Sequence, residues 1–391
     1  MFAKPDFFNK SFLSEVVVFA MFFGLAVDMS GELQIRNISL LVCVTLLVFM
    51  HGVALPKNWM IPFFLFILYP IVLLLMGVLQ DVEIPLAISQ YQSTIFAFII
   101  FVLVCRMPYK LSVQALIYSI FFVALFSVIL AAGLWLGIGP LSAIVSFMAD
   151  AGGGYFGERS VGIESVLPNV YFKVTLFYIP VFLISLFQRR YLISAVCFFG
   201  LVAAVSKTGI VFTLISAVLF FAVKGNLKSR IVVIFLIFLA VIFIINSPIF
   251  FLFDEIAKNE SSTVDVRGGH LRSIVELWLS HPANFVFGFG LGSKFYSSGV
   301  NQVVSNIEID HLNVVRKYGF LWAALFFSWV LSVAYKAIRS DLPEVRGLGW
   351  SLLLAFIVAG TNPVLLSPVF FLFLSVTMAA NFQTRKNLVR K

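Results

Sequence analysis

Charged residues are scarce in this chain. Asp, Glu, Lys and Arg make up 12% of its 391 residues, whereas 61% are hydrophobic. A soluble globular protein has about 25% charged and about 45–50% apolar residues, and the mean hydropathy here is +1.05. This composition excludes a soluble globular protein. It equally excludes an intrinsically disordered chain, which needs low hydrophobicity and high net charge.

Cysteine is nearly absent, and the few cysteines lack any pairing pattern. The three residues Cys43, Cys105 and Cys197 rule out a disulfide-rich scaffold, and none belongs to a CxxC or Cys/His spacing. We interpret them as buried thiols within apolar segments. The sequence also shows no metal-binding motif, so we expect neither a metal nor another cofactor.

Long apolar runs dominate what is present. A helix needs about 20 apolar residues to cross a bilayer, and about a dozen such runs occur, near 11–30, 37–55, 59–80, 86–105, 112–138, 166–187, 191–205, 208–223, 230–252, 311–335, 346–361 and 364–381. The first run contains Glu15 and no small-x-small cleavage site, so we predict an uncleaved span. Lys207 separates the seventh run from the eighth, because a lysine within the bilayer is costly. We predict an all-α polytopic membrane protein that forms one integral domain over 1–391.

The distribution of charge predicts the orientation of these spans. With the N-terminus inside, about 17 of the 27 basic residues fall in inside segments, together with about three acids. The outside segments then hold about 14 acidic residues. Both termini are therefore predicted to be cytoplasmic. The net charge of +9 follows from the excess of basic residues in the inside segments, so it does not indicate a nucleic-acid partner. We expect membrane lipids around the chain.

Two predicted outside segments are long enough to carry function. They cover 139–165 and 253–310, and loops of this length in compact proteins are usually functional or disordered. In the second, Ile274, Leu277 and Trp278 have helical spacing, which predicts a short amphipathic helix over 264–280. His281-Pro282 would end that helix. The glycine-rich stretch 287–292 that follows can pack closely on backbone or ligand.

Four basic residues on the predicted outer side stand out against its acidic character. They are Arg159, Lys207, Arg267 and Arg272. Arginine binds phosphate in a bidentate manner and stays charged in poorly hydrated sites. We therefore predict that these residues form a pyrophosphate site at the outer membrane boundary.

Each of these cations also has a structural interpretation. Arg272 is four residues from Glu276 and can form a surface pair. Arg159 can pair with a neighbouring glutamate, Arg267 can balance Asp265, and Lys207 can extend its amine to the membrane interface. Lys173 lies inside the sixth predicted span, where it must be paired or face a cavity. The sequence leaves these alternatives open.

A candidate proton acceptor occurs at the start of the tenth predicted span. His311 follows Asp310 directly and lies three residues after Glu308. A histidine at this boundary can act as general base toward a sugar hydroxyl, with Asp310 orienting it or taking the role itself. A lone histidine at a helix start is more often structural. His270 and His281 lie in the same long segment in a weaker context.

Several stretches together resemble the O-antigen ligase and polymerase superfamily of bacterial glycan-assembly enzymes. They are Val205 to Gly209, Arg267 to Gly292, Ile307 to Asn313 running on to Tyr318-Gly319-Phe320-Leu321, and Arg159 to Gly162 with Asn169. The similarity covers about residues 155–381. Each motif is loose, and their order, spacing and common predicted side give the resemblance its specificity.

The resemblance implies a GT-C-like arrangement of about twelve spans with a long periplasmic loop between two late ones. It implies metal-independent chemistry on undecaprenyl-pyrophosphate-linked glycans, with arginines on the pyrophosphate. Arg159 and Arg267 match arginine motifs, and Lys207 stands where the family often has arginine, which keeps the charge but loses the bidentate fork. Arg272 matches less closely.

The family members divide at the histidine motif. The ligases have a His-Asn pair, whereas this chain has Asp310-His311-Leu312-Asn313, with Gly319 closer than in the ligases. Glu308-x-Asp310 before a span, followed by Tyr-Gly-Phe, is more similar to the polymerases. We therefore expect a surface-polysaccharide polymerase of the bacterial inner membrane.

Two alternatives stay open. One is the O-antigen ligase, which transfers a finished glycan to lipid A-core, and the other is a lipid-linked oligosaccharide flippase. The expected partners are lipid-linked donor and acceptor oligosaccharides, with a chain-length regulator and a flippase as further candidates. Recognisable repeat halves, usual in transporters, are not evident in the sequence.

Overall fold

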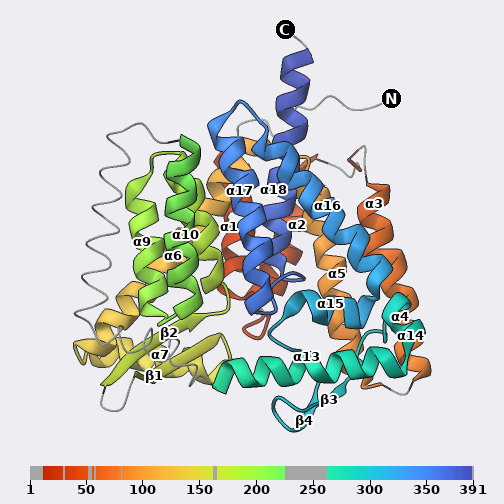
Figure 1. Ribbon diagram of the computed structural model, residues 1–391. Helices are drawn as coiled ribbons and strands as arrows, with labels where there is room; N and C mark the ends of the chain where they lie inside the picture. Colours follow the sequence, from red (N-terminus) through yellow and green to blue (C-terminus); the bar gives the residue numbers. More distant parts are fainter. Residues whose placement is uncertain are drawn as a thin grey trace.

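Helices make up most of the chain (Figure 1). The computed structural model describes residues 12–389, apart from 30, 52–54, 57–58, 81, 162–164 and 225–261. The span predicted over 230–252 lies outside the described residues.

The elements follow one another along the chain with few strands among them. The first half comprises α1 (Phe12–Val27), α2 (Ile35–His51), α3 (Met60–Phe63), η1 (Phe64–Leu68), α4 (Tyr69–Leu79), α5 (Ile84–Val104), α6 (Tyr109–Trp135), α7 (Gly139–Asp150), β1 (Gly154–Val161) and β2 (Ser165–Phe172). The second half comprises η2 (Thr175–Phe177), α8 (Tyr178–Phe187), α9 (Tyr191–Ala203), α10 (Lys207–Lys224), α13 (Ser262–Ser280), α14 (Pro282–Phe287), β3 (Phe295–Ser297), β4 (Gln302–Val304), α15 (Asp310–Tyr318), α16 (Phe320–Ile338), α17 (Pro343–Val358), η3 (Ala359–Thr361) and α18 (Pro368–Val389).

Five helical segments are long and apolar enough to cross a membrane. They are Met60–Leu79, Ile84–Val104, Tyr109–Trp135, Phe320–Ile338 and Pro343–Thr361. Six further apolar helices have between 10 and 17 residues. This is the make-up of a helical membrane protein, as the composition predicts. The full number of about twelve spans stays a prediction.

The first of these spans contains a π-helical turn, η1, between α3 and α4. In a π-helix each backbone carbonyl accepts a hydrogen bond from the N–H five residues later. Pro70 has no backbone N–H, so the carbonyl of Leu65 has no partner within this helix. The indole Nε1 of Trp322 donates to that carbonyl over 2.9 Å. A membrane helix must satisfy such groups internally, and here the hydrogen bond also ties α16 to the first span.

The predicted span over 166–187 is wrong in its first third. Ser165–Phe172 forms strand β2, paired antiparallel with β1 from Gly154↔Phe172 to Val161↔Ser165. Valine and aromatic residues in this stretch favour strand, and Pro168 disfavours a helix interior. Helix begins only at η2 and continues into α8.

The predicted tenth span is divided into two helices. Gly319, with a φ of +81°, separates α15 from α16. Only α16 is apolar enough to cross a membrane. The short α15 has buried polar side chains, including Asp310, Asn313 and Arg316, and lies beside the end of the bundle.

One end of the bundle carries the non-spanning elements, and we call it the loop face. Here α7, the β1–β2 hairpin, α13, α14 and the β3–β4 hairpin gather, with α13 lying across the ends of the long helices (Figure 1). Helix α13 corresponds to the amphipathic helix predicted over 264–280. It buries His270, Ser273 and Ile274, and Ile274 packs with Phe295 and Ile307 in a small apolar cluster.

The glycine-rich stretch 287–292 packs on backbone of two other elements. Phe289 N donates to the Arg316 carbonyl (2.9 Å), and Leu291 N donates to the Leu73 carbonyl in α4 (3.2 Å). Gly288 and Gly319 approach one another so closely that a Cβ on Gly319 would lie 2.4 Å from the carbonyl carbon of Phe287. This packing fixes the loop face to the membrane-spanning bundle.

We therefore expect Gly319→Ala to destabilise the protein. Gly319 has φ +81° and ψ 158°, a conformation that essentially only glycine adopts and that costs other residues about 1–3 kcal/mol, and the backbone clash adds to this. Gly268→Ala on α13 is the matched control, because a Cβ there meets nothing within 4 Å and alanine favours helix. Thermal unfolding in detergent measures both; an unchanged Tm for Gly319→Ala contradicts this packing.

Candidate functional site

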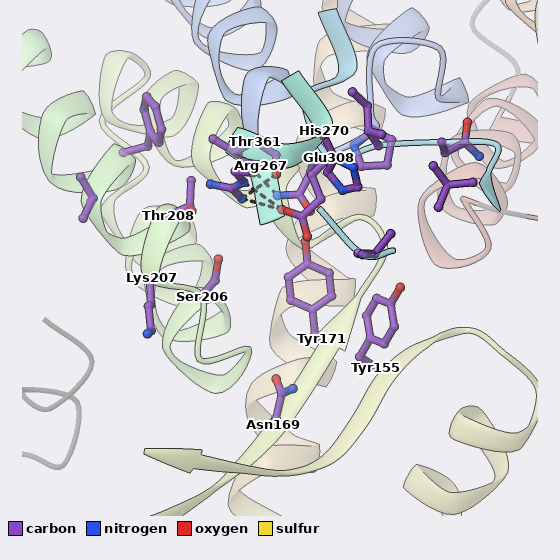
Figure 2. A pocket seen from close by; sticks show the side chains of 18 of the residues that line it. Tyr155, Asn169, Tyr171, Ser206, Lys207, Thr208, Arg267, His270, Glu308 and Thr361 are labelled. Atoms are coloured by element: carbon purple, nitrogen blue, oxygen red, sulfur yellow. Dashed lines mark hydrogen bonds and ion pairs between the residues drawn. The ribbon is translucent and has the colours of Figure 1, made fainter. Parts of the chain in front are cut away.

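A cavity of about 820 Å³ opens where the loop face meets the ends of α10 and α17 (Figure 2). Its walls come from six parts of the chain. They are Tyr155, Asn169, Tyr171, Ser206, Lys207, Thr208, Val211, Phe212, Arg267, His270, Val300, Gln302, Val304, Asn306, Ile307, Glu308, Thr361, Asn362 and Pro363. The wall combines cations, a carboxylate, amides, hydroxyls and aromatic rings.

Arg267 and Glu308 form an ion pair on the wall of this cavity. Arg267 projects from α13, and its Nε and Nη2 lie 2.9 Å and 2.8 Å from the same oxygen, Oε2 of Glu308. Nη2 also donates to the carbonyl of Thr361 over 3.4 Å. The side chains are 31% and 47% exposed, so both groups of the pair are accessible from the cavity.

Lys207 occupies another wall, beside Ser206 and Thr208 (Figure 2). It is the first residue of α10, and the chain enters this helix through Val205, whose φ is +44°. Left-handed backbone is unusual for a β-branched residue. The Ser206 hydroxyl accepts the Gly209 N–H over 3.1 Å. This tight turn places Lys207 at the cavity.

The β1–β2 hairpin supplies an aromatic and polar wall. Tyr155 and Tyr171 face each other across the strands, with ring centroids 6.0 Å apart, and Asn169 lies on the same strand as Tyr171. Burial, with a smaller effect of Glu308, raises the pKa of Tyr171, so its phenol is a neutral donor. Aromatic faces and amide groups suit the recognition of sugars.

His270 also lines the cavity, one helical turn after Arg267. Its Nδ1 hydrogen-bonds the Ser297 hydroxyl, which in turn accepts the Gly299 N–H over 3.2 Å. Burial lowers the pKa of His270, and the nearby Glu308 carboxylate acts in the opposite direction. The β3–β4 hairpin therefore holds the imidazole against the cavity wall.

The three predicted proton acceptors lie in different surroundings. Glu308 lines the cavity. Asp310 is buried, its Oδ2 accepts the Leu365 N–H over 2.6 Å, and burial raises its pKa to about 6. His311 packs against Phe327 and Phe356, with centroids 5.4 Å and 4.7 Å away, and is not among the lining residues.

The four predicted pyrophosphate-binding cations are not all placed together. Arg267 and Lys207 line the cavity, whereas Arg272 lies exposed on α13 and is not among the lining residues. Arg159 lies on β1 opposite Leu167, and its side chain is outside the described part of the chain. The structure thus brings two of the four predicted cations to one site.

Most other cations predicted on the same side contact groups elsewhere. Lys173 pairs with Glu32 over 2.7 Å, and Lys294 pairs with Glu83. Arg36 donates to the Met29 carbonyl and lies over the Phe96 ring. Lys173 lies between β2 and η2, so it is not inside a membrane-crossing helix as predicted, and Glu32 is its ionic partner.

Arg316 is fully buried and connects α15 to the β3–β4 hairpin. Its Nη1 donates to the Ser293 carbonyl (3.1 Å) and hydroxyl (3.0 Å), and its Nη2 donates to the Ser305 carbonyl (2.7 Å) and to Asn313 Oδ1 (3.2 Å). The guanidinium also stacks over Phe295 at 4.8 Å. Burial lowers its pKa to about 9, which leaves it cationic at neutral pH.

Lys317, the next residue, supports the cavity wall through a hydrogen bond. Its amine donates to the side chain of Asn306, which lines the cavity. Burial lowers the pKa of Lys317 to about 7, with Arg316 acting in the same direction and Asp310 against it. The α15 cations are thus structural supports behind the site.

No family model, curated protein or solved structure matches this chain. Within the described residues, no group of three or more His, Cys, Asp and Glu side chains is arranged to hold a metal ion.

Several lining residues carry no signal in the sequence. Thr361, Asn362 and Pro363 follow an apolar helix and belong to no polar pattern. Tyr155 and Tyr171 are aromatic residues in aromatic-rich segments, and only the β1–β2 register places them together. The glycines at 152–154 indicate a change of chain direction before the hairpin, but they do not predict that the hairpin lines a cavity.

We expect Arg316→Met to loosen the β3–β4 hairpin while α15 and α16 remain helical. Methionine fills much of the space but leaves buried oxygens of Ser293 and Ser305 without donors, at a cost of about 2–4 kcal/mol. Limited proteolysis of residues 293–306 and the apparent Tm measure the effect. Arg272→Met, on the exposed surface of α13, is the control. Equal protease resistance of the Arg316→Met variant and the wild type contradicts this role.

Proposed function

We propose that this protein polymerises a bacterial surface polysaccharide, such as an O-antigen, capsule or exopolysaccharide. It would transfer a growing glycan from undecaprenyl pyrophosphate to the terminal sugar of another lipid-linked repeat unit. The observation that carries the proposal is the cavity itself, which presents Arg267, Lys207 and Glu308 together at the ends of apolar helices.

The position of the cavity suits a lipid-linked substrate. Lys207 is the first residue of α10, and Thr361 is the last residue of the span Pro343–Thr361. A polyprenyl chain in the bilayer would bring its diphosphate to this level, and the attached glycan would extend toward the loop face. Such a level is also where cationic side chains favour the membrane interface.

The reaction needs a cationic site and a proton acceptor. An acceptor hydroxyl attacks the anomeric carbon of the donor glycan, and the bond from that carbon to the diphosphate oxygen breaks. Negative charge develops on the leaving diphosphate, where Arg267 and Lys207 stabilise it. Glu308 accepts the hydroxyl proton, since it is the carboxylate that lines the cavity. Arg159 remains a further candidate for the diphosphate, whereas Arg272 lies outside the cavity.

Sugar recognition falls to the remaining walls. Tyr155 and Tyr171 offer ring faces, and Asn169, Gln302 and Asn306 offer amide donors and acceptors. The donor already carries its leaving group, so the reaction requires neither a nucleotide sugar nor a metal ion. This agrees with the absence of a nucleotide-binding motif from the sequence.

The cellular setting forms part of the same proposal. We place about twelve spans in a GT-C-like arrangement in the bacterial inner membrane, with both termini cytoplasmic and the loop face in the periplasm. A flippase would deliver the repeat units, and a chain-length regulator would limit the product.

An O-antigen ligase would use the same lipid-linked donor and would differ only in its acceptor, lipid A-core. A flippase would need a substrate site near the membrane midplane, where transporters usually place it. The cavity instead lies at one end of the spanning helices, which favours a transferase over a transporter.

We expect Arg267→Ala to abolish chain extension in a strain that depends on this protein. Loss of the guanidinium removes stabilisation of the leaving group, typically worth about 2.7–4 kcal/mol in comparable sites, or about 100-fold or more in rate. Gel electrophoresis of the surface glycan should show a single repeat unit. Arg272→Ala, on the same helix but outside the cavity, should give full-length chains.

Other gel patterns would contradict this proposal. Full-length chains from the Arg267→Ala variant at normal protein level would exclude the proposed role of Arg267. Bare lipid A-core would indicate the ligase, and lipid-linked repeat units retained on the cytoplasmic leaflet would indicate the flippase.

We expect His311→Phe to retain polymer formation. Phenylalanine keeps the ring contacts with Phe327 and Phe356, and the side chain does not line the cavity. The same gel assay measures the outcome. Loss of polymer with a normally folded variant would return the proton-accepting role to His311.

A further inference from the structure

The contact between Arg267 and Glu308 has the geometry of an anion bound to a guanidinium. Nε and Nη2 both lie within 2.9 Å of one carboxylate oxygen. These adjacent donors are the ones through which arginine binds phosphate. Glu308 therefore occupies the face of Arg267 that a phosphate group would use.

The pair is arranged so that the carboxylate can be exchanged. Both side chains are partly exposed on the cavity wall, and a partly exposed ion pair contributes little net stability. Arg267 has a second anchor, because Nη2 also donates to the Thr361 carbonyl. The guanidinium can therefore stay in place when Glu308 leaves it.

The charges in the cavity favour this exchange. A diphosphate carries more negative charge than one carboxylate, and its several oxygens can engage two cations at once. Lys207 provides a second cation on the wall beside Ser206 and Thr208 (Figure 2).

We infer that Glu308 holds Arg267 in the place of the donor's diphosphate, and that arrival of the diphosphate displaces Glu308 and frees it to act as base. The role of the released Glu308 as base rests on the proposed function. The displacement of Glu308 from Arg267 requires only that the cavity binds a diphosphate.

Arrival of the diphosphate starts the transfer. The diphosphate takes the Nε and Nη2 donors of Arg267, and the released Oε2 of Glu308 accepts the proton of the acceptor hydroxyl. The hydroxyl oxygen bonds to the anomeric carbon, and the bond between that carbon and the diphosphate oxygen breaks with its electron pair on the diphosphate. Departure of the lipid diphosphate lets Glu308 lose its proton to water and return to Arg267.

Binding of inorganic pyrophosphate to the purified full-length protein in nanodiscs tests the exchange. Glu308→Gln removes the competing charge but keeps the shape of the side chain. We expect it to bind pyrophosphate about fivefold more tightly than the wild type, since an exposed pair of this kind resists displacement by about that factor. Glu276→Gln, an exposed change on α13 away from the cavity, should leave the affinity unchanged, and Arg267→Ala should lose binding.

Two results overturn the inference. Equal or weaker pyrophosphate binding by Glu308→Gln shows that Glu308 does not compete for the site. Full polymerisation by Glu308→Gln, assayed with lipid-linked repeat units, shows that the released carboxylate is not the base. If Glu308→Gln binds pyrophosphate more tightly and no longer polymerises, both the displacement of Glu308 and its role as base are supported.

The proposed function fails in a different way. If wild-type protein binds pyrophosphate but makes no polymer from lipid-linked repeat units, the polymerase assignment is overturned. The anion exchange would still be judged by the affinity difference between Glu308→Gln and Glu276→Gln.

Discussion

The placement of the β3–β4 hairpin against α15 depends on the hydrogen bonds of the buried Arg316 guanidinium. A cation without access to water must find a partner for its donors, and this one finds oxygens of Ser293, Ser305 and Asn313. Those contacts bring the two ends of the β3–β4 hairpin to α15. The chain that leaves the hairpin then carries Asn306 and Glu308 to the cavity.

The membrane sets the second constraint, which decides where a polar site can form. Within the bilayer every backbone group needs an internal partner, as at Leu65, where Trp322 replaces the missing N–H of Pro70. At the ends of the helices this constraint relaxes, so Lys207 and Thr361 can face a hydrated cavity. The site therefore combines side chains from helix ends with those from loops, and its charge is concentrated at one level of the bundle.

The sequence predicts a helical membrane protein and identifies individual charged residues such as Arg267. It does not predict which of these residues lie together in the folded protein. Apolar runs and charge bias depend on local composition, so the bundle and Arg267 could be recognised. The placement of Glu308 opposite Arg267, 41 residues away, depends on the hairpin and on Arg316. The strand at Ser165–Phe172 was hidden because its valines and aromatic residues are equally apolar in a span. His311 stood out by its acidic neighbours, whereas its packing between Phe327 and Phe356 requires the tertiary structure.

The proposed function and the anion exchange both require that the cavity binds a lipid-linked diphosphate at Arg267. An experimental structure of the full-length protein in nanodiscs with undecaprenyl pyrophosphate would locate this group. We expect the diphosphate within hydrogen-bonding distance of Arg267 and near Lys207, with Glu308 turned away from the guanidinium. A diphosphate bound elsewhere, with the Arg267–Glu308 ion pair intact, would contradict it.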